Sequence, residues 1–289
     1  MDLKRILAVT DFSPLGDAAI RRAALLAARE DAELLVVHAL PRRLVLENAF
    51  GTDGDLPASM HTVAAARLAT LVESATQTGV RRVNGEITEG SAHRAVADTA
   101  ESFNPDLLAI GAHGRGLLQQ LFLGGTASRI LTHAPCPVLV ARREPAGDYR
   151  QALAAVDLGP GSEAVLHAAL VVASQARITL FHAYQAPFEA KLRYKNFPEE
   201  DIIRHTVRAH EAAQRNMDAL LADPELAGLD LPSRIVHGNP DSLLPEAAES
   251  LGTELIVAGR HGGSRLGEAV MGSTPRFLVY YAPCDVLVV

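Results

Sequence analysis

Tryptophan is absent from the 289 residues of this chain, and aromatic residues make up only 4% of it. Proteins that bind single-stranded nucleic acid stack the bases on aromatic side chains, so this shortage argues against such a platform. Basic residues are also in the minority, with a formal net charge of −7 and a pI near 5.9. Because nucleic-acid-binding proteins usually carry a basic face, we expect no nucleic acid as a partner.

Cysteine is scarce too. Cys136 and Cys284 each end the phrase APC, and no C-x-x-C motif occurs, so we expect two small buried residues rather than a disulfide framework. The eleven histidines include no H-E-x-x-H motif and no pair four residues apart, which gives no indication of a zinc site. His38 and His182 follow apolar runs and are expected to make structural hydrogen bonds.

Long apolar runs are missing as well. No run reaches the ~20 residues of a membrane span, so no membrane partner is expected. The first residues, MDLKRILAVTDF, hold only four consecutive apolar residues, too few for the core of a signal peptide. The expected location is therefore the cytoplasm. The chain also lacks a G-x-x-x-x-G-K-[ST] motif, which excludes a Walker-type phosphate loop.

The chain does contain an internal repeat. Corresponding residues recur at a nearly constant distance of 144 to 148 positions: Asp11 and Asp157, His38 and His182, Gly90 and Gly238, Gly111 and Gly259, Gly124 and Gly272, Cys136 and Cys284. Such a long period indicates a duplicated domain rather than a solenoid. We expect one domain over residues 1–143 and another over 150–289, joined by a polar linker at about 142–149 that contains Pro145 and Gly147.

Each half alternates short apolar runs with segments of helical period. The expected strands of the first half are Ile6–Thr10, Glu33–His38, Arg82–Ile87, Leu107–Gly111 and Val138–Ala141. Strands rich in Val, Leu and Ile that alternate with helices predict an α/β fold with a parallel sheet covered on both faces. Ser91 and Asn239-Pro240 are typical of helix starts.

A doubly wound sheet opens a crevice where its strand order reverses, beyond the carboxyl ends of the flanking strands. If the first and fourth strands flank that point, Asp11 and Gly111 line one crevice, and Asp157 and Gly259 line the other. Gly259 and Gly262 could adopt positive φ and let a ligand approach closely. The helix that opens with Gly272-Ser273-Thr274 would present free amides and hydroxyls to a phosphate. The alternative is that these glycines only form turns.

The spacing Gly259-x2-Gly262-x9-Gly272-Ser273 resembles the nucleotide motif of the universal stress protein family, in its ATP-binding branch. ILAVTDFS at 6–13, ITEGS at 87–91, DLLAIGAHGRG at 106–116 and APCPVLVAR at 134–142 resemble other signatures of that family. The likeness extends over essentially the whole chain and implies a tandem member. It also implies two five-stranded doubly wound sheets of order 3-2-1-4-5, related by a pseudo-two-fold axis.

The resemblance further implies that the acidic residue after strand one contacts adenine and ribose, and that the glycine loop holds ribose and phosphates. The binding residues it implies in the second half are Asp157, Ala183, Gly259, His261, Gly262, Gly272, Ser273 and Thr274. In the first half they are Asp11, Ala39, Gly111, His113, Gly114, Gly124, Gly125 and Thr126. Gly125 stands where the motif has Ser or Thr, and we therefore expect tighter nucleotide binding in the second half.

The expected function is that of a stress-response regulatory protein that binds ATP, or ADP or AMP, with Mg²⁺ as an accompanying ion and at most slow hydrolysis. An ATPase or nucleotide-processing enzyme and a scaffold that binds no nucleotide stay open as alternatives. Strand five is the expected site of pairing between the two halves, with Val138–Ala141 antiparallel to Val286–Val289. A homodimer of whole chains stays open.

Overall fold

The computed structural model describes residues 2–40, 56–112, 125–195, 197–261 and 271–289. Contacts divide the chain into two units, Met1–Asp148 with Cys284–Val288, and Tyr149–Pro283 with Val289. Residues 284–288 fall with the first unit in this division because residues 286–288 pair with residues 138–140 there, and the expected domain bounds stay a prediction.

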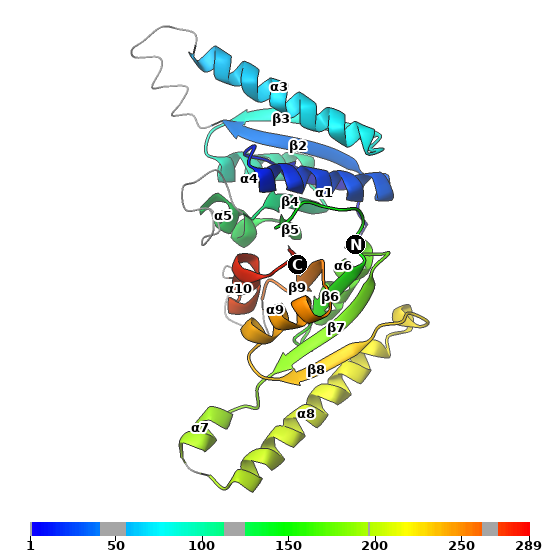
Figure 1. Ribbon diagram of the computed structural model, residues 1–289, viewed down its shortest axis with the longest axis vertical. Helices are drawn as coiled ribbons and strands as arrows, with labels where there is room; N and C mark the ends of the chain where they lie inside the picture. Colours follow the sequence, from blue (N-terminus) through cyan, green and yellow to red (C-terminus); the bar gives the residue numbers. More distant parts are fainter. Residues whose placement is uncertain (1, 41–55, 113–124, 196, 262–270) are drawn as a thin grey trace. The chain divides into compact units, whose positions relative to one another are not determined.

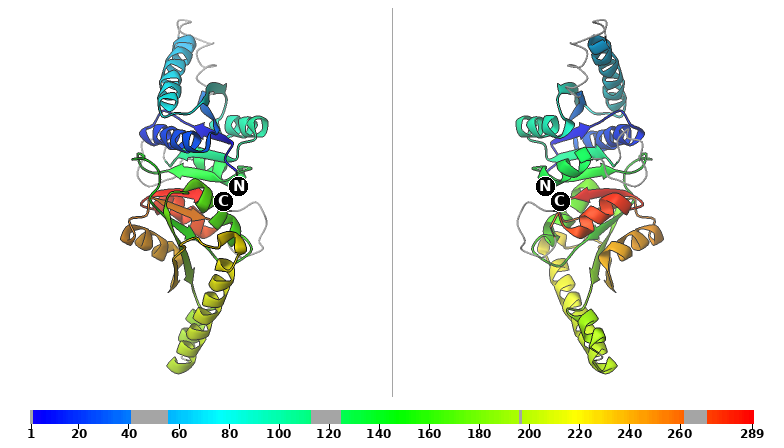
Figure 2. Two further views of the ribbon diagram at one scale, coloured as in Figure 1. Left: turned by 90° about the vertical axis from the view of Figure 1, so that its right-hand side faces the viewer. Right: turned by 90° about the vertical axis from the view of Figure 1, so that its left-hand side faces the viewer.

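The first unit holds five parallel strands in the order β3-β2-β1-β4-β5, which confirms the expected order (Figure 1). The strands are β1 (Arg5–Val9), β2 (Glu33–Leu40), β3 (Arg82–Glu89), β4 (Leu107–Gly111) and β5 (Val138–Ala141). The helices are α1 (Pro14–Glu30), α3 (Leu56–Gln77), α4 (Ala92–Phe103) and α5 (Gly125–His133). In Figure 2, α1 and α3 (blue and light blue) lie on one side of this sheet and α4 (teal) on the other.

The second unit repeats this plan, with parallel strands in the order β8-β7-β6-β9. Its strands are β6 (Gln151–Ala155), β7 (Arg177–Tyr184), β8 (Ser233–His237) and β9 (Leu255–Ala258). Its helices are α6 (Ser162–Val172), α7 (Glu189–Tyr194), α8 (Glu199–Leu221), α9 (Pro240–Ser250) and α10 (Ser273–Tyr281), with a 3₁₀ turn η2 at Pro224–Leu226. Within the described ranges, no helix combines the length and the apolar character needed to cross a bilayer.

The central strands are apolar on both faces because helices cover both. All four residues of β5 and all four of β9 are buried, as is every residue of β4 before Gly111. This continuous burial is typical of parallel sheets. Asn239 begins α9 as expected, with its side chain accepting a hydrogen bond from the amide of Asp241 at 3.0 Å, whereas Ser91 occupies the matching position before α4 without a side-chain bond.

The last strand of the chain, β10 (Asp285–Val288), pairs antiparallel with β5 inside the first unit. Val286 lies opposite Val140, and Val288 lies opposite Val138, which confirms the expected antiparallel pairing of these strands. The two cysteines precede β5 and β10 and are both buried thiols. The pairing covers an edge of the first sheet that would otherwise expose its backbone hydrogen-bonding groups.

Candidate functional site: paired clefts at the strand ends

Each unit has a cleft beyond the carboxyl ends of its first and fourth strands, where the strand order reverses. The first cleft measures about 170 Å³ and the second about 140 Å³. The sequence-predicted residues that line the first are Asp11, Ala39, Gly111 and Thr126. Those that line the second are Asp157, Ala183, Gly259, His261 and Thr274. The predicted residues of each half therefore lie together.

The other predicted residues divide into two groups. Gly125 is the first residue of α5, Ser273 is the first residue of α10, and Gly272 caps α10. These three stand beside the lining residues Thr126 and Thr274 in the sequence. The predicted residues His113, Gly114, Gly124 and Gly262 lie outside the described ranges.

The acidic residue after the first strand sits in the same local structure in both units. Oδ1 of Asp11 accepts a hydrogen bond from the amide of Ser13 at 3.0 Å, and Oδ1 of Asp157 accepts one from the amide of Gly159 at 2.9 Å. The intervening residue has a φ of 60° in each case, at Phe12 and at Leu158. This turn fixes each carboxylate at the mouth of its cleft.

The histidine at the end of the second strand supports that turn. Nδ1 of His38 lies 2.9 Å from the carbonyl oxygen of Thr10, and Nδ1 of His182 lies 2.8 Å from that of Val156. Each ring nitrogen must donate to the carbonyl, because a carbonyl oxygen only accepts. The expected structural role of both histidines is confirmed.

The two units differ in the residue that the helix after strand one places beside the carboxylate. In the second unit, the hydroxyl of Ser162 donates to Oδ1 of Asp157 at 3.1 Å. The corresponding residue of the first unit is Gly16, where an added Cβ would lie only 2.8 Å from Oδ1 of Asp11. The hydroxyl of Ser162 thus has no counterpart at Gly16, which carries no side chain.

The glycine after the fourth strand also differs between the units. A Cβ at Gly111 would lie 2.7 Å from both the amide nitrogen of Gly16 and the carbonyl carbon of Leu15. At Gly259 the nearest atoms to such a Cβ are 3.5 Å away, which is ordinary contact. Gly111 is therefore required by the backbone at the start of α1, whereas the described residues leave room for a methyl group at Gly259.

The expected positive φ at Gly259 is wrong. The structure shows left-handed backbone at other glycines, Gly238 among them, but not at Gly259. The reason is that pairing continues past the end of β9. The amide of Arg260 donates to the carbonyl of Val289 at 2.7 Å, just as Ala112 donates to Ala141 at 2.9 Å in the first unit. Backbone that pairs in this way is extended, so Gly259 does not adopt the left-handed conformation.

Helix α10 begins beside the second cleft. The amide of Gly272 donates to the carbonyl of Arg260 at 2.8 Å, which brings the two ends of the predicted glycine loop together. The first amides of a helix have no partner within the helix and favour an anion. The hydroxyl of Thr274, expected to donate to phosphate, instead donates to Oδ1 of Asp241 at 2.8 Å and so ties α10 to the first turn of α9.

At the ends of β7 and β8, the structure reveals a polar cluster that the sequence patterns did not indicate. Nε2 of His237 lies 2.7 Å from Oε2 of Glu189, and the ring of Tyr184 lies within 5.3–5.7 Å of the rings of His237 and His210. Burial and, to a lesser degree, the charge of Glu189 raise the pKa of Tyr184 above its ordinary value. In the sequence, the one signal for this cluster is that Tyr184 directly follows Ala183, a predicted binding residue.

Among the described residues, no group of three His, Cys, Asp or Glu side chains is arranged to hold a metal ion. Within the part of the chain that the structure describes, the side-chain donors that line the first cleft are the carboxylate of Asp11 and the hydroxyls of Thr10 and Thr126, and those that line the second are Asp157, His261 and Thr274.

The fold and the paired clefts define a doubly wound α/β protein with a ligand crevice at each point where the strand order reverses. Comparison with known proteins then identifies the family. The sequence profile of the universal stress protein family matches residues 2–142 and again residues 148–289. The chain belongs to this family and carries two of its domains in tandem.

Individual relatives support this assignment. Universal stress protein A homolog 1 of Coxiella burnetii (strain RSA 493 / Nine Mile phase I) is 34% identical over 142 residues, which cover 48% of this chain and 96% of the relative. A crystal structure of a universal stress protein from Archaeoglobus fulgidus DSM 4304 covers 100% of this chain and 98% of its own, with 17% identity and a TM-score of 0.67. A protein of Pseudomonas aeruginosa UCBPP-PA14 covers 99% and 93%, with 20% identity and a TM-score of 0.70. At these identities the two structures establish the fold alone.

Proposed function

We propose that this chain is an adenine-nucleotide-binding regulatory protein of the stress response that takes ATP, ADP or AMP in its clefts. The observation that carries the proposal is that a turn-held carboxylate, Asp157, and a helix start, Thr274, line one cleft at the strand reversal. The same pair recurs as Asp11 and Thr126 in the first unit. Membership of the universal stress protein family supports it.

The base and ribose would occupy the carboxylate side of each cleft. In the second unit this side combines the exposed Asp157 with apolar walls from Val156, Val165, Phe181 and Leu244. An ionised carboxylate accepts hydrogen bonds, which suits ribose hydroxyls or the adenine amino group. The flat base would pack against these apolar side chains. The cleft volumes are below the roughly 300–1,000 Å³ of typical ligand pockets, so the phosphates would extend beyond the described walls.

The phosphates would lie toward the helix start. Gly272 caps α10 without a side-chain hydrogen bond, and the amides of the first turn have no partner further back in the helix. Together with the helix dipole, these amides favour an anionic oxygen. In the first unit, Gly125 and Thr126 begin α5 at the corresponding place. Mg²⁺ would reach this side bound to the phosphates.

Calorimetry on the purified full chain tests the proposal. We expect saturable binding of at least one of ATP, ADP and AMP, with and without Mg²⁺, and a higher melting temperature in its presence. Asp157→Ala and Asp11→Ala should each weaken binding at their own cleft by about 10- to 100-fold, because each removes a charge-assisted hydrogen bond. Asp98→Ala, an exposed residue of α4 that lines neither cleft, is the matched control.

Two results would count against this function. If none of the three nucleotides binds, the scaffold alternative gains. If chromatography of the products shows ATP turned over at an ordinary enzyme rate of about ten per second, the chain is an enzyme rather than a nucleotide-binding regulator.

A further inference from the structure

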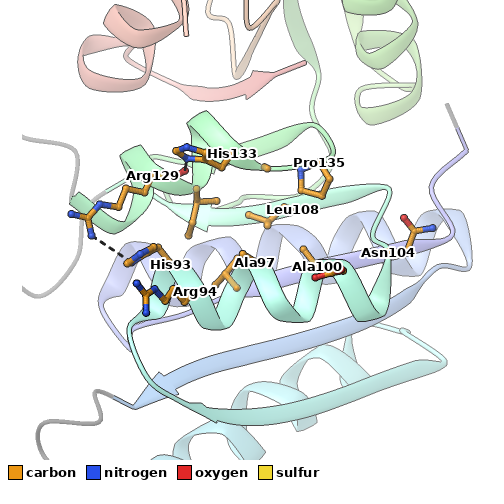
Figure 3. A pocket seen from close by; sticks show the side chains of 13 residues that line it. His93, Arg94, Ala97, Ala100, Asn104, Leu108, Arg129, His133 and Pro135 are labelled. Atoms are coloured by element: carbon orange, nitrogen blue, oxygen red, sulfur yellow. Dashed lines mark hydrogen bonds between the residues drawn. The ribbon is translucent and has the colours of Figure 1, made fainter. Parts of the chain in front are cut away.

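The first unit contains a second, larger cavity between α4 and α5, with a volume of about 800 Å³ (Figure 3). Small side chains line it, with Ala97 and Ala100 on α4, and Ala134 and Pro135 directly after α5. Leu108 lies between them. The volume is within the range of pockets that hold small organic molecules. Among the described residues, Ile130 is the only one that lines both this cavity and the cleft at the strand reversal of the first unit.

Two arginines and two histidines are among the residues that line this cavity, beside apolar side chains and the polar Glu101 and Asn104: His93, Arg94, Arg129 and His133. Figure 3 shows the side chains of Arg129 and His93 pointing toward one another, with Arg94 close by, and Nη1 of Arg129 lies 3.5 Å from Nδ1 of His93. Nδ1 of His133 donates to the carbonyl of Arg129 at 2.9 Å, which leaves Nε2 as its outer nitrogen. Neither arginine forms a salt bridge with another described residue.

The second unit provides an internal control for this basic group. At the repeat distance of 148 residues, the positions of His93, Arg94, Arg129 and His133 are occupied by Asp241, Ser242, Phe277 and Tyr281. The rings of Phe277 and Tyr281 pack against each other with centroids 4.6 Å apart. The same two helices therefore form without any of the four basic or imidazole groups, and the fold does not require them in the first unit.

Glu101, the acidic residue that lines the cavity, lies away from the arginines and histidines. Glu101 follows His93 by eight residues on α4, which is about 12 Å along the helix axis. A ligand with one anionic head group would meet arginine at one end and apolar side chains along its body. A second anion at the far end would be repelled by Glu101.

From this arrangement we propose that the α4–α5 cavity of the first unit binds an amphipathic organic anion, with a single acidic head group held by Arg94, Arg129 and the two histidines and an apolar chain or ring along Ala97, Ala100 and Leu108. An arginine is suited to such a head group because its guanidinium forms two parallel hydrogen bonds to a carboxylate or a phosphate. This inference is independent of nucleotide binding.

Isothermal titration of the full chain with decanoate, decyl phosphate and decanol tests the proposal. We expect saturable binding of decanoate, decyl phosphate or both, and at least tenfold weaker binding of decanol, because decanol lacks the charge. The comparison of the two anions shows which head group the site takes. Saturating ATP should leave the affinity unchanged. Failure of both anions to bind, equal binding of decanol, or displacement by ATP would each overturn the proposal.

Variants place the binding in the cavity. Arg129→Gln should weaken anion binding about tenfold or more, because it removes the charge from an exposed side chain. Ala97→Leu should also weaken binding, because the larger side chain fills part of the cavity. The double variant Arg129→Phe, His133→Tyr, which copies the second unit, should abolish binding. Arg276→Gln, an exposed arginine of α10, is the control and should bind like the parent protein. Unchanged affinity in all three cavity variants would also overturn the proposal, provided that circular dichroism shows them folded.

Discussion

Asp11 and Asp157 show how far two copies of one sequence pattern agree at the residue scale. Both carboxylates accept from the amide two residues ahead, and both turns rest on a histidine from the neighbouring strand. The copies diverge at the glycine after the fourth strand. At Gly111 the backbone of Leu15 and Gly16 comes too close for any side chain, whereas no described residue comes that close at Gly259.

This difference predicts effects of different size on stability for the same substitution at the two glycines. Gly111→Ala should lower the free energy of unfolding by about 1–3 kcal/mol, because the methyl group would press against backbone that cannot turn aside. Gly259→Ala should change stability by less than about 0.5 kcal/mol. Urea unfolding of the two variants checks this pair. Equal destabilisation by both variants would refute the packing argument. Weaker ATP binding by Gly259→Ala at unchanged stability would show that the nucleotide approaches that glycine.

At the scale of elements, the helix start beside each cleft has a different electrostatic setting. Thr274 at the start of α10 is hydrogen-bonded to Asp241 of α9, which places a carboxylate beside the amides proposed to hold phosphate. His93 takes the place of Asp241 in the first unit. The expectation that the second half binds nucleotide more tightly, drawn from Gly125, stays a prediction, and the charge of Asp241 acts against it.

Asp241→Asn should therefore tighten ATP binding at the second cleft by about threefold to tenfold, since asparagine can still accept from Thr274 but carries no charge to repel phosphate. The gain should be larger for ATP than for AMP and should shrink at high salt. Titration calorimetry in an Asp11→Ala background isolates this cleft. Glu249→Gln, an exposed residue two turns further along α9, should have no effect. Weaker or unchanged ATP binding by Asp241→Asn would contradict the argument.

On the scale of the whole molecule, the last strand of the chain completes the sheet of the first unit. β10 brings Asp285 into that unit, where its carboxylate is fully buried. Oδ1 accepts from the amide of Arg142 at 2.8 Å, and Oδ2 lies 3.5 Å from Nε of Arg22 in α1. Arg22 in turn donates to the carbonyl of Gly147 at 2.5 Å. One buried carboxylate thus connects α1, the segment after β5 and the C-terminal strand.

Asp285→Asn should destabilise the protein by about 3–5 kcal/mol, because it leaves the buried guanidinium of Arg22 without its counter-ion. Urea-induced unfolding followed by circular dichroism measures the loss. The control is Glu144→Gln, which removes the ion pair with Arg21 at the surface and should cost no more than about 1 kcal/mol. A loss of similar size in both variants would show that burial does not govern the strength of these pairs.

The sheet was the most predictable part of the structure. Its strands, their order in the first unit and the antiparallel pairing of β5 with β10 follow from apolar runs, the repeat and the family pattern. The positions of Asp157, Ala183, Gly259 and Thr274 around one cleft follow from the same topology. Contacts between side chains of different helices were not predictable, as the bond from Thr274 to Asp241 shows.

By itself, the sequence determined the duplicated α/β fold and the residues that meet at each strand reversal, because the period of apolar residues and the topology of a parallel sheet are set along the chain. Only the tertiary structure decided that Asp285 closes the first unit, that Gly111 and Gly259 differ, and that α4 and α5 enclose a cavity lined by arginine and histidine. The physical reason is that such contacts depend on distances between elements that are far apart in the chain. A local sequence pattern does not specify these distances.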